Sequence, residues 1–253
     1  MRNIKLTIEY DGTDFKGWQL QAEGNRTVQG ELEKALHKIF KKKIRIYGSG
    51  RTDSGVHALG QVAHFRTSST IPVDAICRAL NVNLPHDVSV LKAEEAEKTF
   101  HAQFSARRKM YRYTILNRQE PCAIDRRFCM HVIRPLNTAA MRRAAHAIIG
   151  RHDFRSFVAL DQAKRKKNIV QESSIRTVYI SSLRKRGDYL IFEIEANGFL
   201  YKMVRNLVGT LIAIGSAQPP FTDMKAILNA KDRASAGPTA PPQGLCLVKV
   251  EYT

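Results

Sequence analysis

The sequence contains little of what cofactor, metal and membrane proteins need. Four cysteines occur in 253 residues, and none forms a CxxC pair or lies at zinc-ligand spacing from a histidine. There is no G-x-G-x-x-G fingerprint, no G-x-x-x-x-G-K-[ST] loop, and no apolar run of about 18 residues that could span a membrane. These absences argue against a zinc site, a disulfide framework, nucleotide-dependent redox or phosphoryl-transfer chemistry, and a membrane-embedded chain.

Acidic residues are also scarce. Lysine and arginine number 41 against 23 aspartates and glutamates, which gives a formal net charge of +18 and an isoelectric point near 10.0. Such an excess predicts a polyanionic partner, with nucleic acid as the first candidate. The basic residues occur in short clusters and not along one amphipathic helix, which disfavours a membrane surface. Since the N-terminal segment has no apolar signal-peptide core, we expect a cytoplasmic protein.

Hydrophobic periodicity predicts an α+β fold made of two similar halves. In the first half, strands are expected at Lys5–Tyr10, Ile44–Tyr47, Gln61–Phe65 and Val88–Ala93, with helices at Val28–Phe40 and Val73–Asn83. In the second, strands are expected at Met110–Leu116, Ile175–Ser182, Tyr189–Ala196 and Leu245–Tyr252, with helices around Thr138–Ile149 and from Tyr201 onward. The order β-α-β-β-α-β, occurring twice, predicts two ferredoxin-like halves, residues 1–105 and 106–253.

One carboxylate lies beside one arginine in the glycine-rich segment GSGRTDSGVHA, residues 48–58. In extended backbone, residues two apart point the same way, so Arg51 and Asp53 should share one side while Thr52 points to the other. The arginine would then keep Asp53 ionised and oriented. The alternative is an ordinary Asp-Ser-Gly turn in which Asp53 caps a backbone amide.

A second arginine begins an almost wholly apolar helix in NGFLYKMVRNLVGTLI, residues 197–212. A charge in such surroundings is costly unless paired, so Arg205 should face a carboxylate or a phosphate, with Asp53 as the candidate partner. A surface position for Arg205, or pairing with Glu193 or Glu195, is the alternative.

Aromatic residues alternate along KMYRYTI, residues 109–115, so Tyr111 and Tyr113 should share one face of a strand. A tyrosine there could stack on a nucleobase. Ordinary cross-strand packing is the alternative for either ring.

Short basic clusters, taken together, are candidates for contacts with RNA phosphates, although each alone fits an ordinary solvated face better. The substrate-binding candidates among them are Arg107, Arg108, Lys109, Lys164, Arg165, Lys166 and Lys167. Further clusters occur at Lys41–Lys43, Arg126–Arg127, Arg142–Arg143 and Arg184–Arg186.

Two other functions fit parts of the same pattern. Asp11, Asp14 and Asp53 could hold divalent metal for phosphodiester cleavage, as in a nuclease. Two RRM-like halves could bind RNA without catalysis, although neither contains the RRM signature.

Six segments, in order, resemble the tRNA pseudouridine synthase A family over essentially the whole chain: EYDGTDFKGWQLQ, GRTDSGVHALGQVAHF, KMYRYTIL, GRHDFRSF, NGFLYKMVRNLVG and APPQGLCLVKVEY. The resemblance implies that Asp53 is the catalytic aspartate and Arg51 its accompanying arginine. It likewise implies that Tyr111 is the active-site tyrosine and Arg205 the second active-site arginine. Ser54, where alanine is common in that family, leaves these residue types intact.

The reaction that the resemblance implies is the isomerisation of uridine to pseudouridine in tRNA, at positions 38 to 40 of the anticodon stem-loop. No atom is gained or lost, so no cofactor and no metal are expected, and the target base would be flipped out of its stack. The resemblance also implies a homodimer. Its fold is one continuous, mainly antiparallel sheet, with helices on one side and a basic cleft between the halves. The sequence leaves open whether Asp53 attacks C1′, adds to C6 or acts through a glycal.

Overall fold

A computed structural model describes residues 1–21, 24–159, 173–217 and 223–252 of the chain. Within these ranges the fold is mixed α+β, with ten strands, mostly in antiparallel pairs, and five α-helices. The contacts divide it into two compact units: the first comprises Met1–Arg107 and Cys246–Thr253, the second Arg108–Leu245. No helix in the described ranges combines the length and the apolar character needed to cross a membrane.

The first unit is built on three long strands. Its elements are β1 (Arg2–Tyr10), α1 (Val28–Phe40), β2 (Tyr47–Gly48), β3 (His57–Thr67), α2 (Val73–Asn83), β4 (Val88–Ala96) and most of β10 (Leu245–Glu251). Strand β1 pairs antiparallel with β3 and with β4. Strand β3 also pairs antiparallel with β2, and parallel with β10 near its start.

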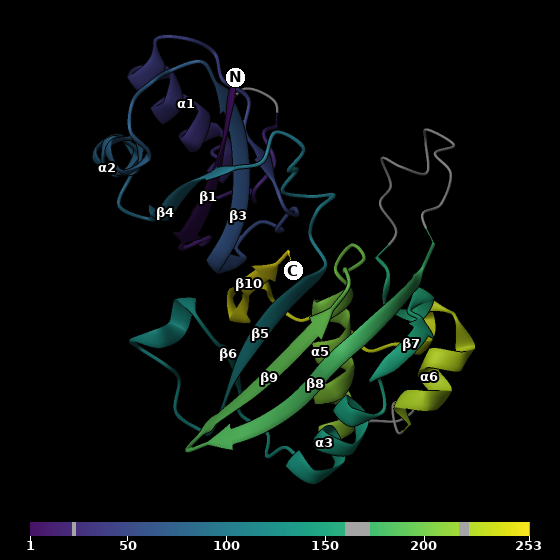
Figure 1. The fold of residues 1–253 in the computed structure, drawn as a ribbon. Helices are drawn as coiled ribbons and strands as arrows, with labels where there is room; N and C mark the ends of the chain where they lie inside the picture. The colour runs from purple at the N-terminus through teal and green to yellow at the C-terminus, as the bar shows by residue number, and fades with distance from the viewer. Residues whose placement is uncertain (22–23, 160–172, 218–222, 253) are drawn as a thin grey trace. The chain divides into compact units, whose positions relative to one another are not determined.

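Helices α1 and α2 lie on the same side of the strands of the first unit (Figure 1). Helix α1 begins at the residue expected from the sequence because Thr27 caps it, its hydroxyl accepting a hydrogen bond from the Gly30 amide. The face carrying Leu32 and Leu36 is buried, as its spacing predicts.

The second unit has a four-stranded antiparallel core in the order β5-β9-β8-β7, and the short strand β6 pairs parallel with β5. Its elements are β5 (Arg108–Asn117), β6 (Met130–Val132), α3 (Thr138–His146), β7 (Gly150–Asp153), β8 (Ile175–Arg186), β9 (Tyr189–Ala196), α5 (Met203–Gly215) and α6 (Met224–Ala230). Helix α5 is buried over most of its length, which confirms the expectation from its apolar sequence.

The expected strand at Ile44–Tyr47 is wrong in extent, because only Tyr47 and Gly48 pair with β3. Side chains of α1 bind the backbone of Ile46 instead: Glu33 accepts from its amide, and the Gln29 amide group donates to its carbonyl. Strands β6 and β7 were not expected from the sequence. The last strand, expected in the second half, hydrogen-bonds to β3, and residues 246–253 belong to the first unit.

Candidate functional site

Asp53 lies in the loop between β2 and β3, which has few exposed positions. Thr52 is buried, whereas Arg51 is exposed and Asp53 is intermediate, which is the alternation expected for extended backbone. The Val56 amide donates to the Asp53 carbonyl over 3.2 Å and closes a turn. Gly55 occupies this turn at φ = 76°, a conformation that other residues rarely adopt.

The loop that contains Phe15 and Trp18 forms hydrogen bonds with the segment that carries Asp53. The Trp18 amide donates to the Thr52 carbonyl over 3.1 Å, and both the Gly55 amide and the Ser54 hydroxyl donate to the Phe15 carbonyl. The rings of Phe15 and Trp18 are buried in the core of the first unit. The backbone that carries Asp53 is therefore fixed by hydrogen bonds to a rigid part of the fold.

A buried hydrogen bond to strand β1 also holds the segment that carries Asp53. The hydroxyl groups of Thr52 and Tyr10 lie 2.8 Å apart, and Tyr10 ends strand β1. Burial raises the pKa of Tyr10 well above its usual range, so its hydroxyl stays neutral. The Gln61 amide group also donates to the Gly50 carbonyl, over 3.0 Å. Sequence reasoning missed these anchors, although Tyr10 lies directly before the DGTD segment.

Arg51 does not pair with Asp53. The exposed Arg51 side chain makes no hydrogen bond or ion pair with any residue that the structure describes. Its guanidinium is thus accessible to a phosphate from solvent.

The acids of the DGTD segment have separate surroundings. The Asp11 carboxylate accepts hydrogen bonds from the amide and hydroxyl of Thr13, and lies 3.1 Å from the buried His57 ring. Asp14 is exposed. Among the described residues, no three acids, histidines or cysteines are arranged to hold a metal ion.

In the second unit, Tyr111 and Tyr113 are both buried on one face of β5, as the alternation predicts. The Tyr111 ring packs edge-on against Phe199, with ring centroids 5.0 Å apart. The Tyr113 hydroxyl donates to the Pro241 carbonyl over 2.8 Å, and burial raises its pKa. The Tyr113 side chain therefore packs inside the second unit.

Arg205 lies in the first turn of α5 and is partly exposed. Its Nε donates to the Ala240 carbonyl over 2.8 Å, and the Ala240 amide donates to the Arg205 carbonyl. The first bond holds the guanidinium of Arg205, and the second holds its backbone. Of the alternative partners, Glu193 binds Arg112 and Arg184, and Glu195 binds Arg108.

The predicted basic cluster at the start of β5 contains one unusual lysine. Lys109 lies two residues before Tyr111, and burial lowers its pKa to about 8. Arg107 and Arg108 are exposed, and the Arg108 guanidinium stacks over Tyr179. The predicted cluster at Lys164, Arg165, Lys166 and Lys167 lies outside the described residues.

Comparison with known proteins gives a consistent result over the whole chain. The sequence profile of the family described as tRNA pseudouridine synthase matches residues 6–105 and 144–253. The chain is 46% identical over 252 residues to tRNA pseudouridine synthase A of Thermoanaerobacter sp. (strain X514), covering 100% of both chains. It is 42% identical over 252 residues to tRNA pseudouridine synthase A 2 of Clostridium perfringens, again over 100% of both. With tRNA pseudouridine synthase A of Halalkalibacterium halodurans it shares 47% identity over 246 residues, 97% of this chain and 90% of that protein.

Proposed function

The chain belongs to the tRNA pseudouridine synthase family, and from that premise we propose that it converts uridine to pseudouridine in the anticodon stem-loop of tRNA with Asp53 as the catalytic carboxylate. Membership makes the protein an isomerase that acts on tRNA. The nucleotides are proposed to be those at positions 38 to 40. The observation that carries the choice of Asp53 is the rigid support of its loop, which Thr52, Gly55 and Ser54 anchor to two other segments of the first unit.

The reaction breaks the C1′–N1 bond of the target uridine, turns the uracil and joins C5 to C1′, so every atom of the substrate is kept. Each of the three routes that the chemistry allows requires Asp53 as an anion. A carboxylate held on fixed backbone can be aligned with the sugar or the base without a large rearrangement, and such alignment lowers the barrier. No cofactor takes part in this scheme.

We assign the arginines and the tyrosine complementary roles. Arg51, exposed beside Asp53, would bind a phosphate of the flipped nucleotide. Arg205, whose Nε is fixed to the Ala240 carbonyl, would orient the anionic groups of the reaction. Tyr111, whose ring is braced by Phe199, would stack on the detached uracil and retain it.

Flipping the target base out of its stem costs about a few kcal/mol, which contacts to the phosphates must offset. The net charge of +18 is suited to that task. Arg107, Arg108, Lys109 and the cluster at 164–167 are the proposed contacts. We also propose the finer architecture expected of the family: two ferredoxin-like halves in one continuous sheet, a basic cleft between them, a homodimer, and a cytoplasmic location.

The test is to incubate an unmodified tRNA transcript with wild-type protein and with Asp53→Asn, in chelator and without any added cofactor. Pseudouridine is then mapped by carbodiimide labelling and reverse-transcription stops. We expect stops at positions 38 to 40 with the wild type and none with Asp53→Asn, whose affinity for tRNA should stay within a few-fold because backbone contacts dominate binding.

The matched control is Asp14→Asn, which removes one negative charge from the loop beside the Asp53 segment. This variant should keep wild-type turnover. Substantial product from Asp53→Asn would remove Asp53 from its role, and chelator-sensitive strand cleavage by the wild type would support the nuclease alternative.

A further inference from the structure

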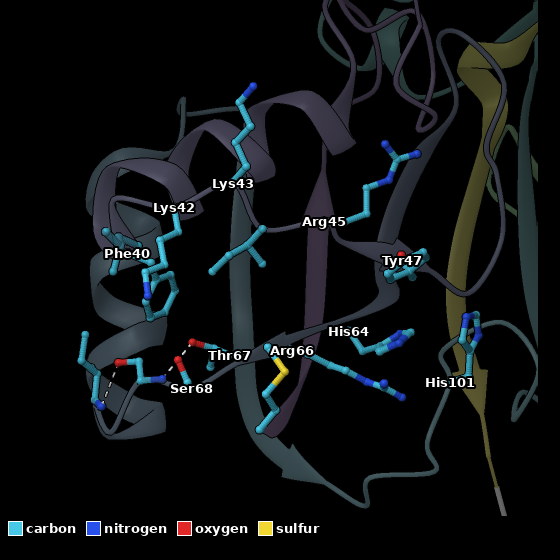
Figure 2. A pocket seen from close by; sticks show the side chains of 15 residues that line it. Phe40, Lys42, Lys43, Arg45, Tyr47, His64, Arg66, Thr67, Ser68 and His101 are labelled. Atoms are coloured by element: carbon cyan, nitrogen blue, oxygen red, sulfur yellow. Dashed lines mark hydrogen bonds between the residues drawn. The ribbon is translucent and has the colours of Figure 1, made fainter.

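A second candidate site lies in the first unit, along β3 and away from the Asp53 loop. It is a pocket of about 730 Å³ between the end of α1, the segment leading into β2, the far part of β3 and the segment around His101 (Figure 2). A volume of this order is typical of sites for small ligands or single nucleotides. We call it the β3 pocket.

The chemistry of the β3 pocket is that of an anion site. Its fifteen lining residues include four cationic side chains, Lys42, Lys43, Arg45 and Arg66, and no aspartate or glutamate. All four are exposed. Arg45 lies 3.7 Å from Glu33, whereas the two lysines and Arg66 form no ion pair with any residue in the described ranges. The charge is therefore available to a bound anion.

One wall of the β3 pocket is aromatic. Tyr47 is 48% exposed and stacks on His64, with centroids 5.3 Å apart and planes at 27°. His64 in turn contacts His101, whose ring stacks on Phe104, an exposed residue outside the pocket lining. Large exposed aromatic rings supported by other rings are the usual platform for an unpaired base.

The backbone fixes both histidines as neutral rings. The Ala102 amide donates to His64 Nδ1 over 3.2 Å, and the Gln103 amide donates to His101 Nδ1 over 3.2 Å. Burial lowers the pKa of His64 to about 4, and burial together with Arg66 lowers that of His101. Each ring therefore carries its proton on Nε2. The buried His64 ring is itself hydrogen-bonded to the Tyr47 backbone, so His101 is the donor beside the aromatic wall.

The β3 pocket is lined by His64, Arg66 and Thr67 of β3, whereas the Asp53 loop precedes the first residue of that strand, His57. His57 begins β3 directly after the Asp53 loop, and His64 lies seven residues further along the same strand. At about 3.3 Å per residue, His57 and His64 lie about 23 Å apart along the strand. The pocket and the Asp53 loop are thus joined by one strand but lined by different residues.

We propose that the β3 pocket binds an unpaired nucleotide of the tRNA substrate, its base against Tyr47 and His101 and its phosphate against Arg66 and Lys42. The proposal rests on the proposed function in taking tRNA as the substrate. It predicts a site that contributes to affinity and leaves the chemical step unchanged.

The test measures the Kd for an unmodified tRNA transcript, its salt dependence, and the single-turnover rate at saturating tRNA. Tyr47→Ala should raise Kd about tenfold, the effect of losing one base–aromatic stack, and Tyr47→Phe should not. Arg66→Gln should raise Kd and reduce the slope of log Kd against log salt by about 0.7, the value for one contact to single-stranded phosphate. The rate at saturation should match wild type in all three.

The charge control is Arg78→Gln on α2, which removes an exposed arginine of the same unit that does not line the pocket. Equal Kd values for Tyr47→Ala and Tyr47→Phe, or for Arg66→Gln and Arg78→Gln, would overturn the proposal. A different result would also overturn it: the wild type binds free uridine monophosphate, the pocket variants do not, and all bind tRNA with the same affinity. That result would indicate a site for small nucleotides. A wild type that forms no pseudouridine would refute the proposed function alone, since the Kd comparison does not depend on turnover.

Discussion

Gly17→Ala tests whether the position of the Asp53 loop controls the reaction. Gly17 has φ = +95°, and a Cβ added there would lie 2.6 Å from the Thr52 carbonyl oxygen and 3.2 Å from the Asp53 carbonyl carbon. Ordinary contact begins at 3.4 Å, so the Thr52 carbonyl must move by 3.4 − 2.6 = 0.8 Å. The Asp53 backbone is bonded to that carbonyl and must follow it. A displacement of about 1 Å at a reacting group can reduce a rate about a hundredfold.

The matched control is Gly24→Ala. Gly24 has φ = +89°, but nothing lies within 4 Å of a Cβ added there. Both variants carry the strain of a positive φ, about 1–3 kcal/mol, and each kcal/mol lowers Tm by about 2–4 °C in a chain of this size. Only Gly17→Ala should also reduce the single-turnover rate on tRNA, by about ten- to a hundredfold, with Kd unchanged. Equal rates for the two variants would refute the coupling between this contact and catalysis.

Two further predictions concern pH. The pKa of His64 is lowered to about 4 by burial and by His101 and Arg66, so the unfolded chain takes up a proton first as the pH falls. The free energy of unfolding should therefore decrease from about pH 6.5 towards pH 4, and His64→Gln should flatten the curve in urea titrations; parallel curves would contradict this. The pKa of Lys109 is lowered to about 8, so between that pH and its ordinary value the unfolded chain holds a proton that the folded chain has lost, and stability should rise with pH. Lys109→Met should accordingly remove this rise of the free energy of unfolding with pH. If Lys109 contacts a phosphate, the wild type should lose tRNA affinity above pH 8, where Lys109 loses its charge, and Lys109→Met should not show this loss. The same pH profile of Kd in both proteins would argue against the contact.

The sequence predicts elements well where one face of the element is buried. Helices α1 and α2 occur at their expected bounds because their apolar residues follow helical spacing. Strand β3 extends beyond the expected Gln61–Phe65 since it is buried almost continuously, so no alternation marks its ends. The segment before β2 looks like a strand by its residues, but Glu33 and Gln29 bind the backbone of Ile46, a tertiary contact that no local pattern reveals.

The same distinction applies to functional residues. Asp53 and Arg51 are adjacent in sequence, so their motif is visible there, whereas the β3 pocket gathers residues from separate segments near 42, 47, 66 and 101. The supports of the Asp53 loop are equally dispersed, since Tyr10 and Phe15 belong to earlier segments. The proposed reacting carboxylate precedes β3, and the proposed nucleotide pocket is lined by the far part of the same strand. Variants at the two ends should therefore change Kd and the single-turnover rate independently, and their effects should be additive in free energy.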